Sequence, residues 1–437
     1  MATADLRSGA HRLDGTERDH RPLLDLIGEA RFVLLGEGSH GTHDFYHERA
    51  EITKRLIIEK GFNAVAVEAD WPDAYRVNRY VRGDSDDADA DAALAGFERF
   101  PTWMWRNTVV LDFVEWLRNA NSARNANSKT GFFGLDLYSL FNSMAAVVSY
   151  LDAVDPDAAQ RARYRYSCFE HFGEDSQAYG YAASFDLSRS CEDEAINQLL
   201  EMQRRSMNYL GSNDADEFFD AEQNARLVKN AEQYYRSMFR GRQSSWNLRD
   251  THMADTVSAI VSYLTRHRRD PKIVIWAHNS HLGDARATEM GARGELNVGQ
   301  LIRQKYGPAA VLVGFTTYTG TVTAATNWDE PGERKLVRPA LPNSYELGFH
   351  ETGIPRFFLD LSDGAGGTAL MSKPRLERAI GVIYRPETER VSHYFQADLR
   401  NQFDAVYHFD ETRALEPLEK PERWHELELP ETYPSGI

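Results

Sequence analysis

The chain lacks long uninterrupted runs of apolar residues. In its 437 residues no apolar window reaches the length of about 18 that a membrane-spanning helix requires. Residues 1–10 contain no apolar segment of the kind that forms the centre of a secretory signal. We therefore expect a cytoplasmic protein that neither crosses nor binds a membrane.

Cysteine is nearly absent, because Cys168 and Cys191 are the only two. Two thiols in a chain of this length fit a reducing compartment and provide no disulfide framework. A bridge between them is the less favoured interpretation, so we expect two free thiols.

Positive charge is scarce. The chain has 50 Lys and Arg against 66 Asp and Glu, which gives a net charge of −16. This balance disfavours nucleic-acid partners, which bind to clustered basic residues, and mildly favours cationic small molecules. The acidic residues 84–91 resemble a calcium loop in composition but lack the glycine and closing glutamate of an EF-hand, so a solvated surface loop is expected.

Short apolar segments alternate with helical patterns. Apolar residues make up 42% of the chain, enough for a globular protein. The expected strands are residues 31–36, 64–68, 131–136, 272–276, 310–315 and 357–360, and a helix is expected over 43–60, ended by Gly61. Strands that alternate with helices predict an α/β fold with a mostly parallel central sheet flanked by helices. The first two strands are expected to be parallel neighbours.

Residues 155–249 contain no clear strand and many aromatic residues. We interpret this segment as a helical insertion that acts as a lid over the catalytic edge of the sheet. The α/β catalytic core then comprises residues 1–154 and 250–437. The aromatic side chains of the insertion could line a binding site or simply pack its helices.

Two polar segments stand at the ends of expected strands. Residues 36–43 read Gly-Glu-Gly-Ser-His-Gly-Thr-His, and residues 276–281 read Trp-Ala-His-Asn-Ser-His. With His47, these two segments account for five of the 14 histidines. In open α/β sheets ligands bind beyond the carboxyl ends of the strands, so both segments are expected to share one site. An enzyme is the leading interpretation.

The residue types at these strand ends allow three hydrolytic mechanisms. A histidine could activate water beside a carboxylate, the same side chains could hold a divalent metal, or Ser39 could act as a nucleophile. The third is weakest, because a nucleophile elbow needs glycine where the chain has Glu37. Each residue also has a structural interpretation: Glu37 could form a buried ion pair with Arg49, and Glu68 or Asp136 could cap a turn.

The combined motifs resemble the erythromycin esterase family over nearly the whole chain. They are the segment from Gly36 to His43 with Glu48 and Arg49 after it, the segment Val67-Glu68-Ala69-Asp70-Trp71, and the segment from Trp276 to His281. The resemblance implies a bacterial hydrolase that opens the lactone ring of 14-membered macrolides and confers antibiotic resistance. It implies no cofactor and no metal.

The resemblance also implies roles for particular residues. The residues expected to be catalytic are Glu37, His40, Arg49, Glu68, His278 and His281, with His40 as the proposed general base. His278, His281 and Arg49 would bind the oxyanion, and Glu37 or Glu68 would orient the water. Asp136 and His43 are expected to contact the small-molecule substrate. The pair Arg249-Asp250 resembles another family segment of less certain role.

Alternatives remain open at this stage. The same histidines and glutamates could be ligands of a divalent metal in a metal-dependent hydrolase. The chain could instead be a non-enzymatic binder of haem or another ligand, with imidazole as axial ligand. Which histidine is the base is not determined by the sequence.

Overall fold

The computed structural model describes residues 2–16, 18–172, 175–185, 187–206, 209, 215–239, 241–267, 269–362 and 370–420. Its centre is a mixed sheet whose strands run in the order β1-β8-β11-β6-β2-β5-β3-β4, with β7 pairing to β6 beside this path. The strands of this sheet are β1 (Ala10–Arg12), β2 (Phe32–Leu35), β3 (Ala64–Asp70), β4 (Gly131–Asp136), β5 (Ile273–Trp276), β6 (Ala310–Ala324), β7 (Glu333–Val337), β8 (Arg356–Asp360) and β11 (Ala405–Thr412). A separate pair joins β9 (Arg375–Arg378) to β10 (Tyr394–Ala397).

The six strands from β11 to β4 are parallel, whereas β8, β1 and β7 pair antiparallel to their neighbours. The α/β class and all six expected strands are therefore confirmed. The expectation that the first two strands are neighbours was wrong, because β5 lies between β2 and β3 and pairs with both. Consequently β5, which precedes His278, lies between β2, which precedes His40, and β3, which contains Glu68.

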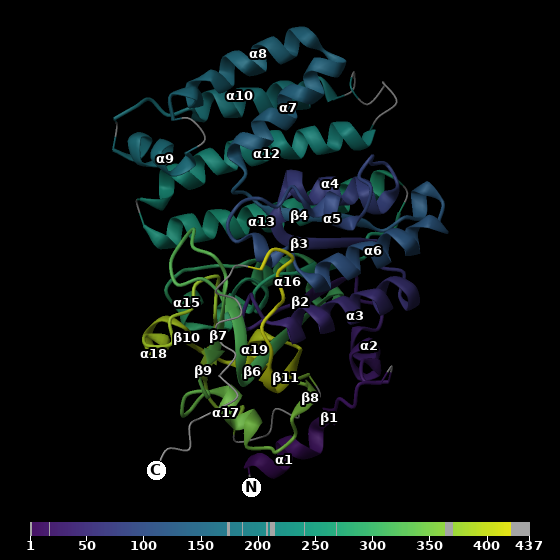
Figure 1. Ribbon diagram of the computed structural model, residues 1–437, viewed down its shortest axis with the longest axis vertical. Helices are drawn as coiled ribbons and strands as arrows, with labels where there is room; N and C mark the ends of the chain where they lie inside the picture. The colour runs from purple at the N-terminus through teal and green to yellow at the C-terminus, as the bar shows by residue number, and fades with distance from the viewer. Residues whose placement is uncertain are drawn as a thin grey trace, which may run out of the picture.

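Helices cover both faces of the sheet (Figure 1). The first half of the chain supplies α1 (Ala2–Gly9), α2 (Arg21–Ile27), α3 (His43–Glu59), α4 (Trp71–Arg82), α5 (Ala90–Leu94) and α6 (Thr108–Ser122). The second half supplies α14 (Asn279–Leu282), α15 (Glu289–Ala292), α16 (Val298–Tyr306), α17 (Tyr345–His350), α18 (Glu389–Ser392) and α19 (Leu399–Gln402). None of the helices in the described ranges is long and apolar enough to span a membrane.

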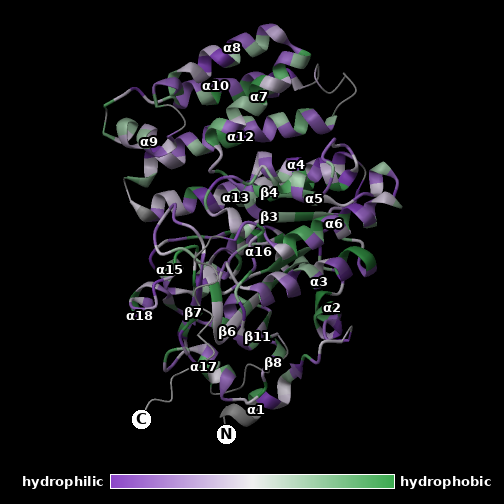
Figure 2. Cartoon of the chain, viewed as in Figure 1, coloured by the Kyte–Doolittle hydropathy of each residue, from purple (hydrophilic) through white to green (hydrophobic). Residues whose placement is uncertain are grey.

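The parallel strands are apolar on both sides, as strands buried between two helix layers must be. Successive residues of β2 alternate between two cores: Val33 and Leu35 pack with residues of α3 and α6, whereas Phe32 and Leu34 pack with residues of α13 and α16. In Figure 2 the strand β3 is accordingly coloured as hydrophobic.

The helix α3 carries a buried stripe that contains one charged residue. Phe45, Ile52 and Leu56 lie at helical spacing and are fully buried, and Arg49 lies on the same face with 1% exposure. The helix ends at Glu59, and Gly61 follows with a φ of 71°, a left-handed conformation suited to glycine.

The expected helical insertion is present and is longer than predicted, since helices occupy residues 140–266. They are α7 (Leu140–Val154), α8 (Pro156–Tyr166), α9 (Ser176–Ser184), α10 (Glu192–Arg204), α12 (Ala215–Met238) and α13 (Arg242–Arg266). In Figure 1, α7, α8, α10 and α12 form one end of the molecule, whereas α1, α17 and β8 lie at the other.

Cys168 and Cys191 form a disulfide inside this helical region, so the expectation of two free thiols was wrong. Their Cα atoms lie 6.0 Å apart, and the two residues belong to η3 (Ser167–Phe172) and to the N-cap of α10. Composition could not predict this pairing, because it arises from the packing of helices that are separate in the sequence.

The disulfide can be tested by thiol counting. Protein purified and denatured without reductant should react with no iodoacetamide, and reduced protein should react at two residues. Closing a loop of this size should stabilise the fold by roughly 3 kcal/mol, so reduction should lower the melting temperature. Two reactive thiols before reduction would contradict the pairing.

Candidate active site

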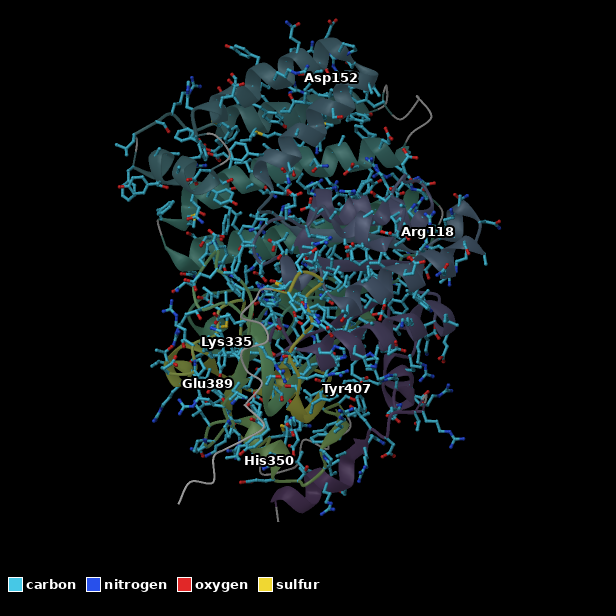
Figure 3. All side chains as sticks on the ribbon, viewed as in Figure 1. Arg118, Asp152, Lys335, His350, Glu389 and Tyr407 are labelled. Carbon is cyan, nitrogen blue, oxygen red and sulfur yellow. A yellow bond between two sulfur atoms is a disulfide. The ribbon has the colours of Figure 1, made fainter. Side chains whose placement is uncertain are left out.

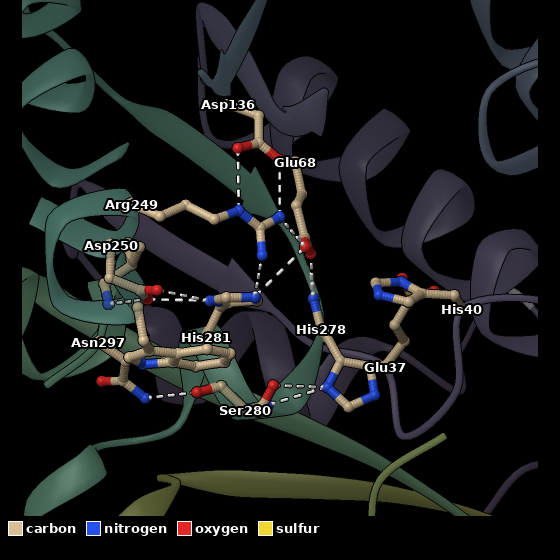
Figure 4. A network of polar contacts seen from close by, with 12 residues as sticks. Glu37, His40, Glu68, Asp136, Arg249, Asp250, His278, Ser280, His281 and Asn297 are labelled. Carbon is tan, nitrogen blue, oxygen red and sulfur yellow. Dashed lines mark hydrogen bonds and ion pairs between the residues drawn. The ribbon is translucent and has the colours of Figure 1, made fainter. Parts of the chain in front are cut away.

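The predicted residues converge at the carboxyl ends of four neighbouring strands. Glu37 and His40 follow β2, Glu68 lies near the end of β3, Asp136 ends β4, and His278 follows β5. Because these strands are parallel and adjacent, their ends bring together residues far apart in sequence. Figure 4 shows the network that they form.

One part of the network holds His40. A Glu37 Oε1 atom lies 2.9 Å from His40 Nδ1, and Arg49 Nη2 donates to Glu37 Oε2 at 2.7 Å. The guanidinium of Arg49 also lies over the rings of Tyr46 and Trp276, 4.3 Å and 5.3 Å from their centroids. A carboxylate can only accept, so Nδ1 of His40 carries the proton. In the neutral imidazole, Nε2 is then the basic nitrogen.

A second part is centred on Arg249 of α13. Its guanidinium donates to both oxygens of Asp136, at 2.9 and 2.6 Å, and to Glu68 Oε1 at 2.7 Å. Glu68 Oε2 accepts from the backbone N–H of His278 at 2.9 Å. Burial alone would raise the pKa of Glu68, but neighbouring His281, His40 and Arg249 hold that pKa well below its usual range. Burial also opposes ionisation of Asp136, but Arg249 outweighs it and lowers the pKa of that carboxyl, so both carboxylates are ionised and each of their oxygens accepts a hydrogen bond.

His281 is held on both ring nitrogens. Its Nδ1 lies 2.9 Å from Asp250 Oδ1, while its Nε2 lies 3.1 Å from Arg249 Nη1 and 3.3 Å from Glu68 Oε1. The ring stacks on Trp246 at a centroid distance of 4.5 Å. Burial opposes protonation, but the carboxylates of Asp250 and Glu68 outweigh it and raise the pKa of His281. With both nitrogens engaged, His281 orients its neighbours and has no free atom for a substrate.

His278 has the opposite tautomer to His40. Its Nδ1 accepts from the backbone N–H of Ser280 at 3.2 Å and lies 2.9 Å from the hydroxyl of Ser280. A backbone N–H is always a donor, so Nδ1 is unprotonated and the proton of the neutral ring lies on Nε2. Nε2 is buried without a hydrogen-bond partner among the described residues.

Charge on His278 is disfavoured. Burial and then the nearby His40 hold the pKa of His278 well below its usual value. Glu68 and the backbone of Gly38 act in the opposite direction and are weaker, and Gly38 makes no hydrogen bond with Nε2. The rings of His278 and His40 lie 4.9 Å apart. The pair therefore offers one basic nitrogen and one unused N–H donor at the same place.

A cavity of about 510 Å³ opens onto this network. Its lining includes His40, Glu68, Asp136, Arg249, His278 and His281. Eight aromatic residues line it as well, together with charged residues such as Asp70, Asp73 and Arg99; the aromatic residues are Phe97, Phe100, Trp105, Tyr138, Trp246, Trp328, Tyr394 and Phe395. Such a volume and such a lining are typical of sites for small organic ligands.

The lid role predicted for residues 155–249 receives no support from the cavity. Of the described residues in that segment, Trp246 and Arg249 line it, and both belong to α13. The aromatic residues Tyr164, Tyr181 and Phe185 are more than half exposed, at 82%, 52% and 55%. The walls come instead from residues 97–105, 289–293 and 379–395 and from Trp328.

Three predicted residues, Glu37, Arg49 and His43, do not line the cavity. Arg49 lies behind Glu37 with 1% exposure, so the structure does not support a direct contact with an oxyanion. His43 begins α3, hydrogen-bonds Arg413, stacks on His47 and does not line the cavity. Asp136 lines the cavity, but Arg249 occupies its oxygens.

Metal binding receives no geometric support within the described residues, where no group of three or more His, Cys, Asp or Glu side chains is arranged to hold an ion. The centre of the carboxylate cluster is filled by the guanidinium of Arg249, a fixed positive charge. A cation beside it would be repelled.

The sequence interpretation did not assign roles to Arg249, Asp250, Trp246 or Ser280. The resemblance had marked the pair Arg249-Asp250, and Asp250 carries a further signal: it occupies the apolar stripe that continues with Met253, Val257 and Ile260, all fully buried. A carboxylate on the buried face of a helix requires a partner, which is His281.

The chain is similar to known proteins in sequence and in structure. The model of the family described as erythromycin esterase matches residues 57–412, a range that begins after Glu37, His40 and Arg49. The chain is 23% identical to erythromycin esterase type II of Escherichia coli, over 92% of this chain and 94% of that protein.

Two solved structures share the fold. A protein from Bacillus cereus superposes with a TM-score of 0.78 at 21% identity, covering 96% of this chain and 98% of that one. The erythromycin esterase EreC, a mutant in its open conformation, gives a TM-score of 0.67 at 16% identity, covering 93% and 96%.

The buried ion pair of Arg49 and Glu37 predicts a large stability effect. Arg49→Ala leaves an unpaired carboxylate in the core and should lower the free energy of unfolding by about 3–5 kcal/mol in urea titrations. The control is Arg163→Ala, since Arg163 pairs with the exposed Asp152 in the helical region (Figure 3). The control should leave stability nearly unchanged. Equal losses in both variants would contradict the assignment.

Proposed function

The chain belongs to the erythromycin esterase family, and we propose that it is a carboxylic ester hydrolase in which His40 activates the attacking water. The observation that carries this proposal is the pairing of opposite tautomers, a basic Nε2 on His40 beside an unpartnered Nε2–H on His278. Ester hydrolysis needs both, one to accept the proton of water and the other to donate to the carbonyl oxygen.

The reaction assigns one task to each group. His40 Nε2 takes a proton from water as the water oxygen bonds to the ester carbon, and Glu37 stabilises the imidazolium through Nδ1. The oxyanion accepts from His278 Nε2–H and from Arg249, which lines the cavity and carries a positive charge. The carbon–oxygen bond to the alcohol then breaks, and protonated His40 returns its proton to the leaving oxygen.

The remaining residues act through these groups. Asp136 and Glu68 fix the guanidinium of Arg249, and Asp250 and Trp246 fix His281 beside it. Arg49 orients Glu37. Glu68 is the less suitable group for orienting water, because both of its oxygens are already engaged.

The proposed substrate is the macrolactone of a 14-membered macrolide. The family and the name of the Escherichia coli relative support it, and so does a cavity of about 510 Å³ lined in part by aromatic residues. The acidic chain weakly favours such a ligand, because the amino sugar of a macrolide is cationic at neutral pH. Action on such a substrate in the cytoplasm would confer resistance.

Hydrolysis should add one water to the macrolide, and mass spectrometry detects this directly. His40→Ala should lower kcat by roughly 10²–10⁴-fold, as loss of a general base usually does. The matched control is His43→Ala, a histidine of the same segment outside the cavity, which should retain turnover. Wild-type turnover in His40→Ala would remove it from the mechanism, and hydrolysis of aryl esters without any macrolide would reject the substrate.

Activity should also survive metal removal. A metal mechanism needs three or more ligands at about 2.0–2.2 Å, and the guanidinium of Arg249 fills the position between the carboxylates. Exhaustive chelation should leave the rate unchanged, and elemental analysis should find no stoichiometric metal. Loss of activity that one specific divalent ion restores would contradict the proposal and would recast the histidines as ligands.

A further inference from the structure

A buried glutamate outside the cavity contacts the turn that carries His278. Glu377 belongs to β9 and is fully buried. Its Oε1 accepts from Asn279 Nδ2 at 3.2 Å, and a side-chain contact with Gln402 also involves it. Nothing in the hydrolytic mechanism uses this carboxyl, and a buried polar group of this kind costs stability unless its contacts have a role.

Asn279 connects Glu377 to both histidine segments. Its backbone N–H donates to the carbonyl of Glu37 at 2.8 Å, and its Nδ2 also donates to the carbonyl of Phe315 at 2.9 Å. The fit is tight, because a Cβ atom on Gly36 would lie 2.2 Å from Asn279 Oδ1. Small displacements of the Asn279 amide would therefore move the strand end that leads to His40.

The chain that follows Glu377 contacts the His40 segment directly. The N–H of Ile380 donates to the carbonyl of Gly38 at 2.9 Å, and the N–H of His40 donates to the carbonyl of Ile380 at 3.1 Å. Residues 377–380 thus touch the turn of His278 at one end and the loop of His40 at the other. This segment therefore contacts the backbone or side chains next to both rings, those of His40 and His278.

We propose that Glu377 is a positioning residue that, through Asn279, fixes the His278 turn against the His40 loop. The proposal rests on the proposed function, since it assigns a role to that alignment. We expect the carboxyl to be neutral, because it is fully buried and Glu377 Oε2 has no hydrogen-bond partner among the described residues.

The charges around Glu377 agree with a neutral acid. Glu346 and Tyr345 face it from α17, Asn279 from α14 and Gln402 from α19, and none of these is a cation. Arg378, the next residue of β9, makes its ion pair with Glu389. Burial and then Glu346 raise the pKa of Glu377 to about 8.

The sign of the pH effect follows from this raised pKa. A carboxyl with a higher pKa in the folded state binds its proton more tightly there, so the fold loses stability as the pH rises from the unfolded value toward 8. Glu377→Gln keeps an oxygen acceptor for Asn279 and cannot ionise. Its melting temperature should match the wild type near pH 5 and exceed it by several degrees at pH 9.

The control is Glu351→Gln, because Glu351 is exposed just after α17 and its profile should parallel the wild type. Parallel profiles for Glu377→Gln and wild type would overturn the neutral-acid assignment.

The positioning role has its own readouts. In Glu377→Ala, the imidazole NMR signals of His40 and His278 should shift while those of buried His408 stay unchanged, and kcat should fall at least tenfold with KM little changed. Glu377→Gln should restore both.

Unmoved signals in a folded Glu377→Ala protein would overturn the proposal, even if the wild type hydrolysed no ester. A wild-type kcat in Glu377→Ala would also overturn it. Absence of any esterase activity together with shifted signals would reject the proposed function alone. If Glu377→Ala does not fold, unchanged signals and kcat in Glu377→Asp, whose shorter side chain withdraws the acceptor from Asn279, would overturn it.

Discussion

The guanidinium of Arg249 is the charge on which the arrangement of the site depends. It reaches from α13 to the ends of β3 and β4, where it binds Glu68 and Asp136 and contacts His281. Without it, two buried carboxylates would repel each other at the edge of the sheet. With it, the second oxygen of Glu68 accepts a hydrogen bond from the backbone N–H of His278. The ion cluster thus joins the ends of β3 and β4 to α13 and α14.

His40 and His278, which lie beside this cluster, have opposite tautomers. Glu37 imposes one tautomer on His40, and the backbone of Ser280 imposes the other on His278. Neither assignment depends on the identity of a ligand, since both follow from groups that can act only as acceptor or only as donor. The proposed site is therefore preorganised in this account, with its basic nitrogen and its N–H donor defined before any substrate enters.

Much of this could be predicted from the sequence. Apolar segments closed by acids or histidines gave the strands and the edge where Glu68, Asp136 and His278 meet, because parallel strands end on the same side. Strand order could not be predicted, since β5 enters between β2 and β3 from a distant part of the chain. For Arg49 the sequence left two alternatives, a buried ion pair with Glu37 and contact with an oxyanion, and the structure shows the ion pair.

The central claim is that His40 presents an unprotonated Nε2 and His278 a protonated one. Long-range ¹⁵N–¹H correlation spectra of ¹⁵N-histidine-labelled protein at neutral pH measure this directly, with assignments from His40→Ala and His278→Ala. The account predicts a neutral Nδ1–H tautomer for His40 and a neutral Nε2–H tautomer for His278. A proton on Nδ1 of His278, or on Nε2 rather than Nδ1 of His40, would contradict it.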